Sequence, residues 1–255
     1  MFDTIDGRRT IGGIVERANG DAAGARTLFE GPWWCDQVAS PTRRPSSGDD
    51  MSTQPGTATY TADEALARLV AGNERFVSGE ARFPTVQKEI LAKLARRQQP
   101  YATIIGCSDS RVPPELLFDA GFGELFIIRV AGNVISPEIM GTVQYAGVHL
   151  RTPLFVVLGH QGCGAVQAAL ATMFHGVRER SRIATLLRSM TPGLKGIRPG
   201  RNTAARLNAA VEANVRWSIR QLEETPEVRA RHAEGVMKLV GAVYELTTGR
   251  VRFLA

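Results

Sequence analysis

Three short apolar runs, separated by segments of helical periodicity, constrain this chain more than any other feature of its sequence. They are YATIIG at 101–106, ELFIIRV at 124–130 and PLFVVLG at 153–159, each bounded by turn-forming or polar residues. Runs of this length are typical of strands buried on both faces of a parallel sheet. A helix opened by Ser136 and Pro137 lies between the second and third runs, and the helical segment GAVQAALATMF follows the third. The alternation predicts βαβ units and an α/β fold.

Two amphipathic segments precede the first run and predict an N-terminal helical arm. The first begins at Thr61, which has capping-box spacing to Glu64, and it ends at Gly79. The second covers residues 86–98.

The part of the chain after the third run completes the predicted fold. Prolines and glycines predict a loop over 191–200, and apolar periodicity predicts a long helix over about 203–224. The segments MKLVGAVYEL and VRFLA flank TTGR and predict two antiparallel strands. The expected fold class is therefore α/β: a mostly parallel central sheet flanked by helices, with an N-terminal helical arm and C-terminal antiparallel strands.

The beginning of the chain lacks this regularity. Residues 1–58 contain the Pro/Ser/charged stretch SPTRRPSSGDD and are expected to be a poorly ordered tail or linker, whereas 59–255 are expected to form the folded domain. The sequence becomes regular directly after Met51, so we also consider the hypothesis that translation begins there. Mass spectrometry of the native N-terminus tests this hypothesis.

Composition and charge limit where the protein is expected to be located and which partners it is expected to bind. No window approaches about 18 consecutive apolar residues, and no secretory signal opens the chain, so we expect a cytoplasmic protein with no membrane contact. The net charge is +6. The densest basic residues lie around Arg178, Arg180 and Arg182 and from Lys195 to Arg206, with no interleaved aromatic pattern. This pattern favours a solvated surface over a nucleic-acid site.

Two cysteines and one histidine follow two of the predicted strands. Cys107 comes directly after the first run in GCSDSR, and His160 comes directly after the third in LGHQGCG, three residues before Cys163. The carboxyl ends of the strands in a doubly wound sheet line the crevice where ligands bind. Taken singly, each residue is more often a packing residue. Together, two thiolates and an imidazole favour Zn²⁺ with a fourth coordination position free.

Asp109 and Arg111 follow Cys107 at alternate positions and can belong to the same site. A bidentate pair would keep the Asp109 carboxylate ionised and oriented, so that it accepts a proton from zinc-bound water. The alternative is that Asp109 is the fourth zinc ligand, which would leave no coordination position free for water.

The segments CSDSRVPPELLF, GELFIIRVAGNV and LGHQGCGAV resemble the β-class carbonic anhydrases, in the order and spacing of that family, over about 62–254. The resemblance implies a zinc lyase in which zinc-bound hydroxide reversibly hydrates carbon dioxide to bicarbonate and a proton. It implies the zinc ligands Cys107, His160 and Cys163 and a catalytic dyad of Asp109 and Arg111.

The same resemblance implies a substrate pocket and an assembly. The side-chain amide of Gln98 would hold substrate, Phe126 and Tyr145 would form apolar walls, and the backbone N–H of Gly164 would contact the bound anion. The family also implies a homodimer or a tetramer.

One departure from the family concerns the resting state of the zinc. A subset of the family closes its zinc with the Asp and has a bicarbonate pocket that uses a Trp three residues before the first Cys and an Arg further on. Here Ile104 stands at the first position, although Arg129 matches the second. We therefore expect the open form, with two cysteines, one histidine and water.

Two other functions fit the same residues. The same zinc site could hydrolyse carbonyl sulfide or carbon disulfide, which a comparison of turnover on these gases discriminates. Alternatively, the chain could be a non-catalytic zinc scaffold or a thiol redox sensor, which would hold zinc without hydrating carbon dioxide. Asp109, Arg111 and Gln98 favour the enzyme, because a structural zinc site does not need them.

Overall fold

Five strands form one sheet in the part of the chain that the structure describes. The computed structural model describes residues 60–82, 88–199 and 203–254, so the predicted tail at 1–58, with Met51, lies outside the described residues. The strands are β1 (Ala102–Gly106), β2 (Leu125–Arg129), β3 (Leu154–His160), β4 (Lys238–Tyr244) and β5 (Val251–Leu254). Their order is β2-β1-β3-β4-β5, with β5 alone antiparallel to its neighbour. The predicted fold class is confirmed.

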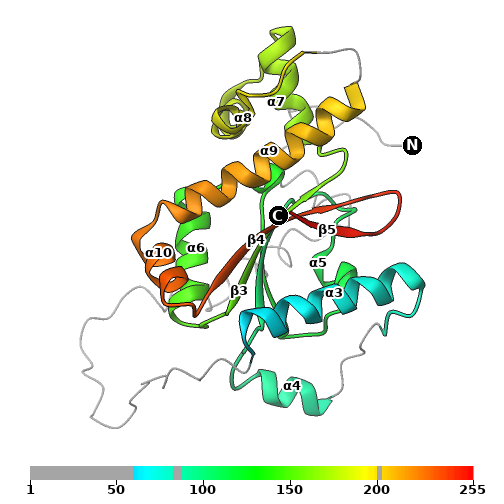
Figure 1. The fold of residues 1–255 in the computed structure, drawn as a ribbon, viewed down its shortest axis with the longest axis vertical. Helices are drawn as coiled ribbons and strands as arrows, with labels where there is room; N and C mark the ends of the chain where they lie inside the picture. Colours follow the sequence, from blue (N-terminus) through cyan, green and yellow to red (C-terminus); the bar gives the residue numbers. More distant parts are fainter. Residues whose placement is uncertain (1–59, 83–87, 200–202, 255) are drawn as a thin grey trace, which may run out of the picture. The chain divides into compact units, whose positions relative to one another are not determined.

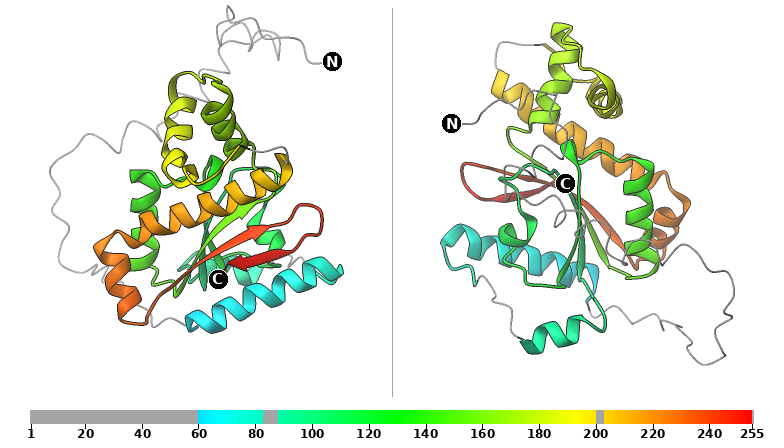
Figure 2. Two further views of the ribbon diagram at one scale, coloured as in Figure 1. Left: turned by 45° about the horizontal axis from the view of Figure 1, so that its top comes forward. Right: turned by 180° about the vertical axis from the view of Figure 1, so that it is seen from behind.

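Helices cover both faces of this sheet (Figures 1 and 2). They are α3 (Ala62–Ser78), α4 (Lys88–Leu94), α5 (Pro114–Leu117), α6 (Pro137–Val148), α7 (Gly164–His175), α8 (Ser181–Leu194), α9 (Thr203–Glu223) and α10 (Pro226–Ala233), with the 3₁₀ turn η1 (Ala131–Asn133). Residues of α3 and α5 pack on one face, and residues of α6 to α10 pack on the other. Among the described helices, none combines the length and apolar character needed to cross a bilayer.

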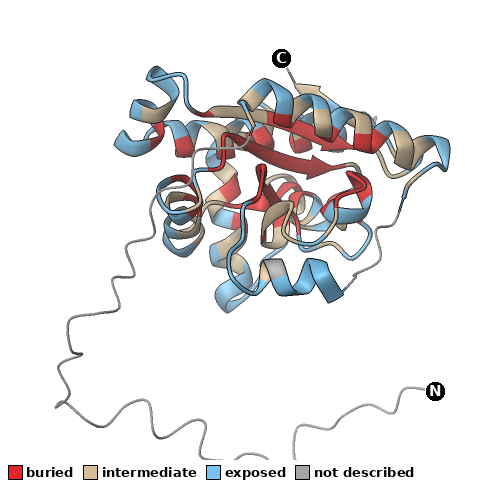
Figure 3. Cartoon of the chain, turned by 90° about the horizontal axis from the view of Figure 1, so that it is seen from below, coloured by how far each residue is buried: buried red, intermediate tan, exposed pale blue. Residues whose placement is uncertain are grey.

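Strand side chains alternate between the two cores. Ile104 of β1 and Val156 of β3 belong to the core beneath α3, whereas Ile105 and Val157 belong to the core beneath α9. All four side chains are fully buried, and the strands form the buried layer between the helices (Figure 3). Burial on both faces explains why the strands are continuous apolar runs, since each such side chain stabilises the fold by about 1.5–3 kcal/mol.

Local hydrogen bonds set the ends of α3 as the sequence predicted. The Glu64 N–H donates to Thr61 Oγ1 at 3.2 Å, and the Thr61 N–H donates to Glu64 Oε2 at 2.7 Å. Gly79 ends the helix in the left-handed conformation, with φ 78°. The capping box and the glycine stop are therefore confirmed.

Gly72 permits a close approach of α3 to Phe118, the C-cap residue of α5. A Cβ at this position would lie 1.9 Å from the carbonyl oxygen of Phe118. We expect Gly72→Ala to lower the free energy of unfolding by about 1–3 kcal/mol, because the helix must move away from its neighbour. Chemical denaturation measures this change.

Gly141→Ala is the matched control. Gly141 also lies inside a helix, α6, and a Cβ there would meet nothing within 4 Å. Alanine should leave stability unchanged or raise it by up to about 1 kcal/mol, because it is the better helix former. Equal stability changes in the two variants would contradict the close packing of α3 on α5.

Two predicted boundaries are wrong. The predicted loop over 191–200 begins only after Leu194, because α8 continues through Pro192. Met190 and Leu194, at helical spacing, are both fully buried, and their packing outweighs the one backbone hydrogen bond that Pro192 cannot donate. The predicted helix over 86–98 is helical only over Lys88–Leu94 in its described part.

Candidate metal centre

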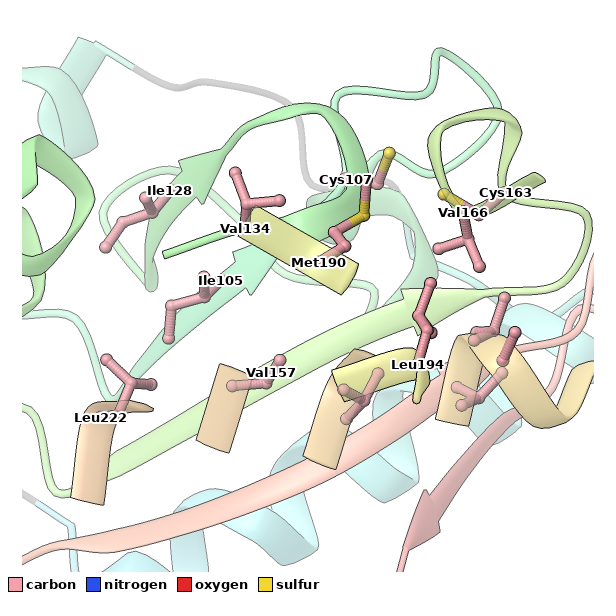
Figure 4. Packing of buried hydrophobic residues seen from close by; sticks show 14 of the residues in the cluster. Ile105, Cys107, Ile128, Val134, Val157, Cys163, Val166, Met190, Leu194 and Leu222 are labelled. Carbon is pink, nitrogen blue, oxygen red and sulfur yellow. The ribbon is translucent and has the colours of Figure 1, made fainter. Parts of the chain in front are cut away.

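Cys107, His160 and Cys163 converge at the carboxyl ends of β1 and β3. Cys107 follows β1, His160 is the last residue of β3, and Cys163 is the N-cap of α7. Because β1 and β3 are parallel neighbours, these ends lie side by side. The three ligand atoms lie within 4.8 Å of one another, and no residue of the three is more than 5% exposed. Figure 4 shows the side chains of Cys107 and Cys163 along the upper edge of the core cluster.

The histidine nitrogen that faces this cluster lacks a hydrogen-bond partner. His160 Nδ1 lies 3.0 Å from the Gln161 carbonyl oxygen, which can only accept, so Nδ1 carries the proton. The other nitrogen, Nε2, is buried and has no hydrogen bond in the described structure. An unpartnered buried acceptor costs about 1–3 kcal/mol, and a metal ion would satisfy it. Two sulfurs and one such nitrogen fit zinc.

The two thiols hold their protons unequally. Hydrogen bonding from the Cys163 thiol lowers the pKa of Cys107 to about 4, against its burial, and the Gly132 N–H donates to Cys107 Sγ at 3.3 Å. Hydrogen bonding to Cys107 and burial raise the pKa of Cys163. The hydrogen bond between the two sulfurs therefore favours the thiolate at Cys107, and metal binding would release the protons that the two thiols retain.

Asp109 and Arg111 form a bidentate ion pair beside the cluster. Arg111 Nε donates to Asp109 Oδ1 at 2.9 Å, and Arg111 Nη2 donates to Oδ2 at 2.7 Å. The Arg111 guanidinium holds the pKa of Asp109 well below its usual range. Asp109 Oδ2 lies 3.8 Å from His160 Nε2. An ionised carboxylate of fixed orientation therefore faces the candidate metal position.

Arg129 holds the backbone that carries the first ligand. Its Nε donates to the Cys107 carbonyl at 2.9 Å, and its Nη2 donates to the Asp109 carbonyl at 2.6 Å. The family resemblance matched Arg129 to a bicarbonate-pocket position, and in the structure its guanidinium is hydrogen-bonded to the loop that follows β1. Ile104, at the other position of that pocket, is fully buried in the α3-side core.

The four predicted substrate-binding residues are placed differently. Gly164 begins α7 directly beside Cys163, and the space that a Cβ would enter there is open. Phe126 and Tyr145 lie together, with ring centroids 6.2 Å apart, and Gln98 is exposed after α4. Among the described contacts, no hydrogen bond or ring contact joins these last three residues to the three candidate ligands.

Known proteins resemble this chain over most of its length. Residues 102–251, which include all three candidate ligands, match the family model for carbonic anhydrase. Carbonic anhydrase 2 of Mycobacterium tuberculosis is 38% identical over 188 residues, which cover 73% of this chain and 89% of that protein. The carbonic anhydrase of Mycolicibacterium smegmatis is 37% identical over 189 residues, which cover 73% of this chain and 90% of that protein.

A solved structure shares the fold. A Coccomyxa β-carbonic anhydrase aligns with a TM-score of 0.59 at 28% identity, and the alignment covers 74% of this chain and 86% of that one. Sequence and structure thus point to the same group of proteins.

Proposed function

Because the chain belongs to the β-carbonic anhydrase family, a family of lyases, we propose that it reversibly hydrates carbon dioxide to bicarbonate and a proton, with zinc held by Cys107, His160 and Cys163. One observation carries the proposal: the three ligand atoms lie within 4.8 Å of one another, and the Asp109 carboxylate faces the unpartnered His160 Nε2 at 3.8 Å. When bound, zinc supplies a Lewis acid that lowers the pKa of a water at its free position.

Asp109 orients the attacking water. Arg111 keeps the carboxylate ionised, so Asp109 accepts a hydrogen bond from the attacking water and turns a lone pair of that water toward carbon dioxide. The backbone N–H of Gly164, in the first turn of α7, contributes a donor for the bicarbonate product. Gln98, Phe126 and Tyr145 remain predictions for substrate binding.

We propose the open form of the centre, in which Asp109 stays outside the coordination sphere. Both carboxylate oxygens of Asp109 already accept hydrogen bonds from Arg111, whose backbone N–H also donates to Oδ1 at 3.0 Å. Coordinating a metal would require Asp109 to give up part of this pairing. A crystal structure of the zinc-loaded protein above neutral pH that shows Asp109 on the metal would refute the open form.

We also propose a homodimer or tetramer and a cytoplasmic location. Large apolar side chains are exposed near the helical arm, with Leu91 of α4 48% exposed and Phe122, before β2, 63% exposed. Exposed apolar surface of this kind favours association. Sedimentation equilibrium of the purified protein tests the assembly, and fractionation of cells tests the location.

Stopped-flow hydration of carbon dioxide, combined with a zinc assay on the same sample, tests the function. We expect one zinc per chain, loss of activity with a chelator, and recovery when zinc is restored. Stoichiometric zinc without hydration at any pH would instead indicate a scaffold or thiol sensor. Faster turnover of carbonyl sulfide or carbon disulfide would assign the site to those substrates.

Hydration activity is expected to rise with pH through an inflection above neutral. The two thiolates of Cys107 and Cys163 would balance the charge of a zinc ion, so they make its water harder to ionise than in a three-histidine site, where the pKa is ~7. Asp109 is not the source of the inflection. Its pKa is lowered, so the carboxylate is charged throughout this range. Stopped-flow rates across the range measure the profile, and a flat profile from about pH 6 to about 9 would contradict this ordering.

A further inference from the structure

Asn214 and Ser218 are polar side chains within the buried apolar face of α9. Asn214 is 1% exposed and Ser218 is fully buried. The other buried residues of this helix are Ala210, Val211, Val215 and Leu222. A buried amide or hydroxyl destabilises the fold unless it is hydrogen-bonded, so the partners of these two side chains show what they do.

Both side chains bond to the 3₁₀ turn η1. Asn214 Nδ2 donates to the Gly132 carbonyl at 2.8 Å, and Ser218 Oγ donates to the Asn133 carbonyl at 2.9 Å. Asn133 Nδ2 returns a bond to Ser218 Oγ at 3.3 Å. Asn214 Oδ1 has no hydrogen-bond partner among the described residues. The side chain of Asn214 therefore acts on η1 as a hydrogen-bond donor. The two polar residues of α9 therefore fix one turn.

The conformation of η1 needs such support. Gly132 and Asn133 both have left-handed backbones, with φ 67° and 43°, and Asn133 pays a steric penalty there. A Cβ at position 132 would lie 2.8 Å from Met190 Sδ and 3.1 Å from the Ala165 Cβ. The turn is thus enclosed by α7, α8 and α9, and only glycine fits at its centre.

This conformation directs a backbone donor at the metal centre. The N–H of Gly132, the residue whose carbonyl Asn214 holds, donates to Cys107 Sγ at 3.3 Å, and this hydrogen bond is buried. Partners that hydrogen-bond to a metal ligand orient it and tune its donation to the metal.

We propose that Asn214 is a positioning residue for the metal centre, which acts through Gly132 to hold and orient the Cys107 sulfur. The inference rests on the metal site of the proposed function but not on the reaction. A donor on the sulfur withdraws some electron density from it, but it also holds the sulfur in place. We expect the loss of this positioning to weaken zinc binding more than the added electron density strengthens it. Ser218 supports the same turn one residue further along.

Asn214→Leu tests the proposal, because leucine has the same number of side-chain heavy atoms in the same branched arrangement and no donor. We expect the dissociation constant for zinc, measured by chelator competition, to rise about 10–100-fold. In the cobalt-substituted protein, the thiolate-to-metal charge-transfer band should move to lower energy, because a sulfur without its donor releases electrons more easily. If this variant does not fold, Asn214→Ala, which removes the donor without adding volume, is measured in the same way.

Leu222→Ala is the matched control. Leu222 is buried on the same helix at 1% exposure, and its aliphatic side chain cannot form a hydrogen bond to η1. Truncation should lower the stability of the protein while leaving zinc affinity and the cobalt band unchanged. Equal changes in Leu222→Ala and Asn214→Leu would reduce the effect to general destabilisation and overturn the proposal.

A measurement on the wild-type protein completes the test. In cadmium-loaded protein, the Gly132 amide proton should show a spin coupling to the cadmium nucleus through the hydrogen bond to Cys107, and its absence would overturn the proposal. If the wild-type chain binds metal but does not hydrate carbon dioxide, the proposed function fails, and the zinc affinities still decide the role of Asn214.

Discussion

Cys163→Ala should remove zinc and, with it, all measurable hydration of carbon dioxide. The substitution leaves two ligands, Cys107 and His160, in a pocket built for three, and a two-ligand site does not retain the ion against dilution. Activity should fall to the uncatalysed background, a loss of about 10⁶-fold or more, because enzymes accelerate their reactions by at least about that factor. Elemental analysis of the purified variant and stopped-flow assays measure both losses.

Cys35→Ala provides the control, since this third cysteine lies outside the motifs that carry the ligands. It should keep one zinc per chain and wild-type activity. Full zinc occupancy in folded Cys163→Ala would show that the ion is held elsewhere, and the assignment of the centre would then be wrong.

The sheet was predictable because its signal is local in the sequence. Ile104 and Ile105 are neighbours in the chain, yet their side chains belong to opposite cores. A strand that is covered on both faces therefore has an unbroken run of apolar residues in the sequence. The ends of α3 were predictable for a similar reason, since Thr61 and Glu64 bond to each other. The end of α8 was not. Pro192 and Gly193 suggest a stop by themselves, and only the burial of Met190 and Leu194 keeps the turn helical.

In the candidate metal centre, too, the features set by local sequence were predictable and those set by distant residues were not. Parallel strands predict that Cys107 and His160 lie together, because each follows the carboxyl end of its strand. The hydrogen bonds that hold Cys107 were not predictable from its neighbours in the sequence. The donor to its sulfur is the backbone N–H of Gly132, 25 residues away, and the donor to its carbonyl is the Arg129 side chain, 22 residues away. Backbone donors leave no residue type to recognise. The signal that could have found this one is the glycine in RVAGN, directly after β2, where a left-handed turn is needed.

Asp109→Asn should retain zinc and lose most of its turnover. An amide of the same shape no longer carries the negative charge that accepts the hydrogen bond from the attacking water, and its NH₂ group would face Arg111 in one of its two orientations. A positioned proton acceptor contributes about 10²–10⁴-fold to a rate, so we expect kcat to fall by that factor. Stopped-flow assays on samples of known zinc content measure it.

Asp63→Asn separates this effect from a general loss of charge. Asp63 is an exposed carboxylate paired with Lys238 on the outside of α3, and its substitution should leave kcat and zinc content unchanged. If Asp109→Asn instead loses zinc together with activity, Asp109 is a ligand and the centre is closed at rest. If the variant keeps full activity, the Asp109–Arg111 pair acts only on the shape of the loop, because the charge that orients the nucleophile must then come from another group.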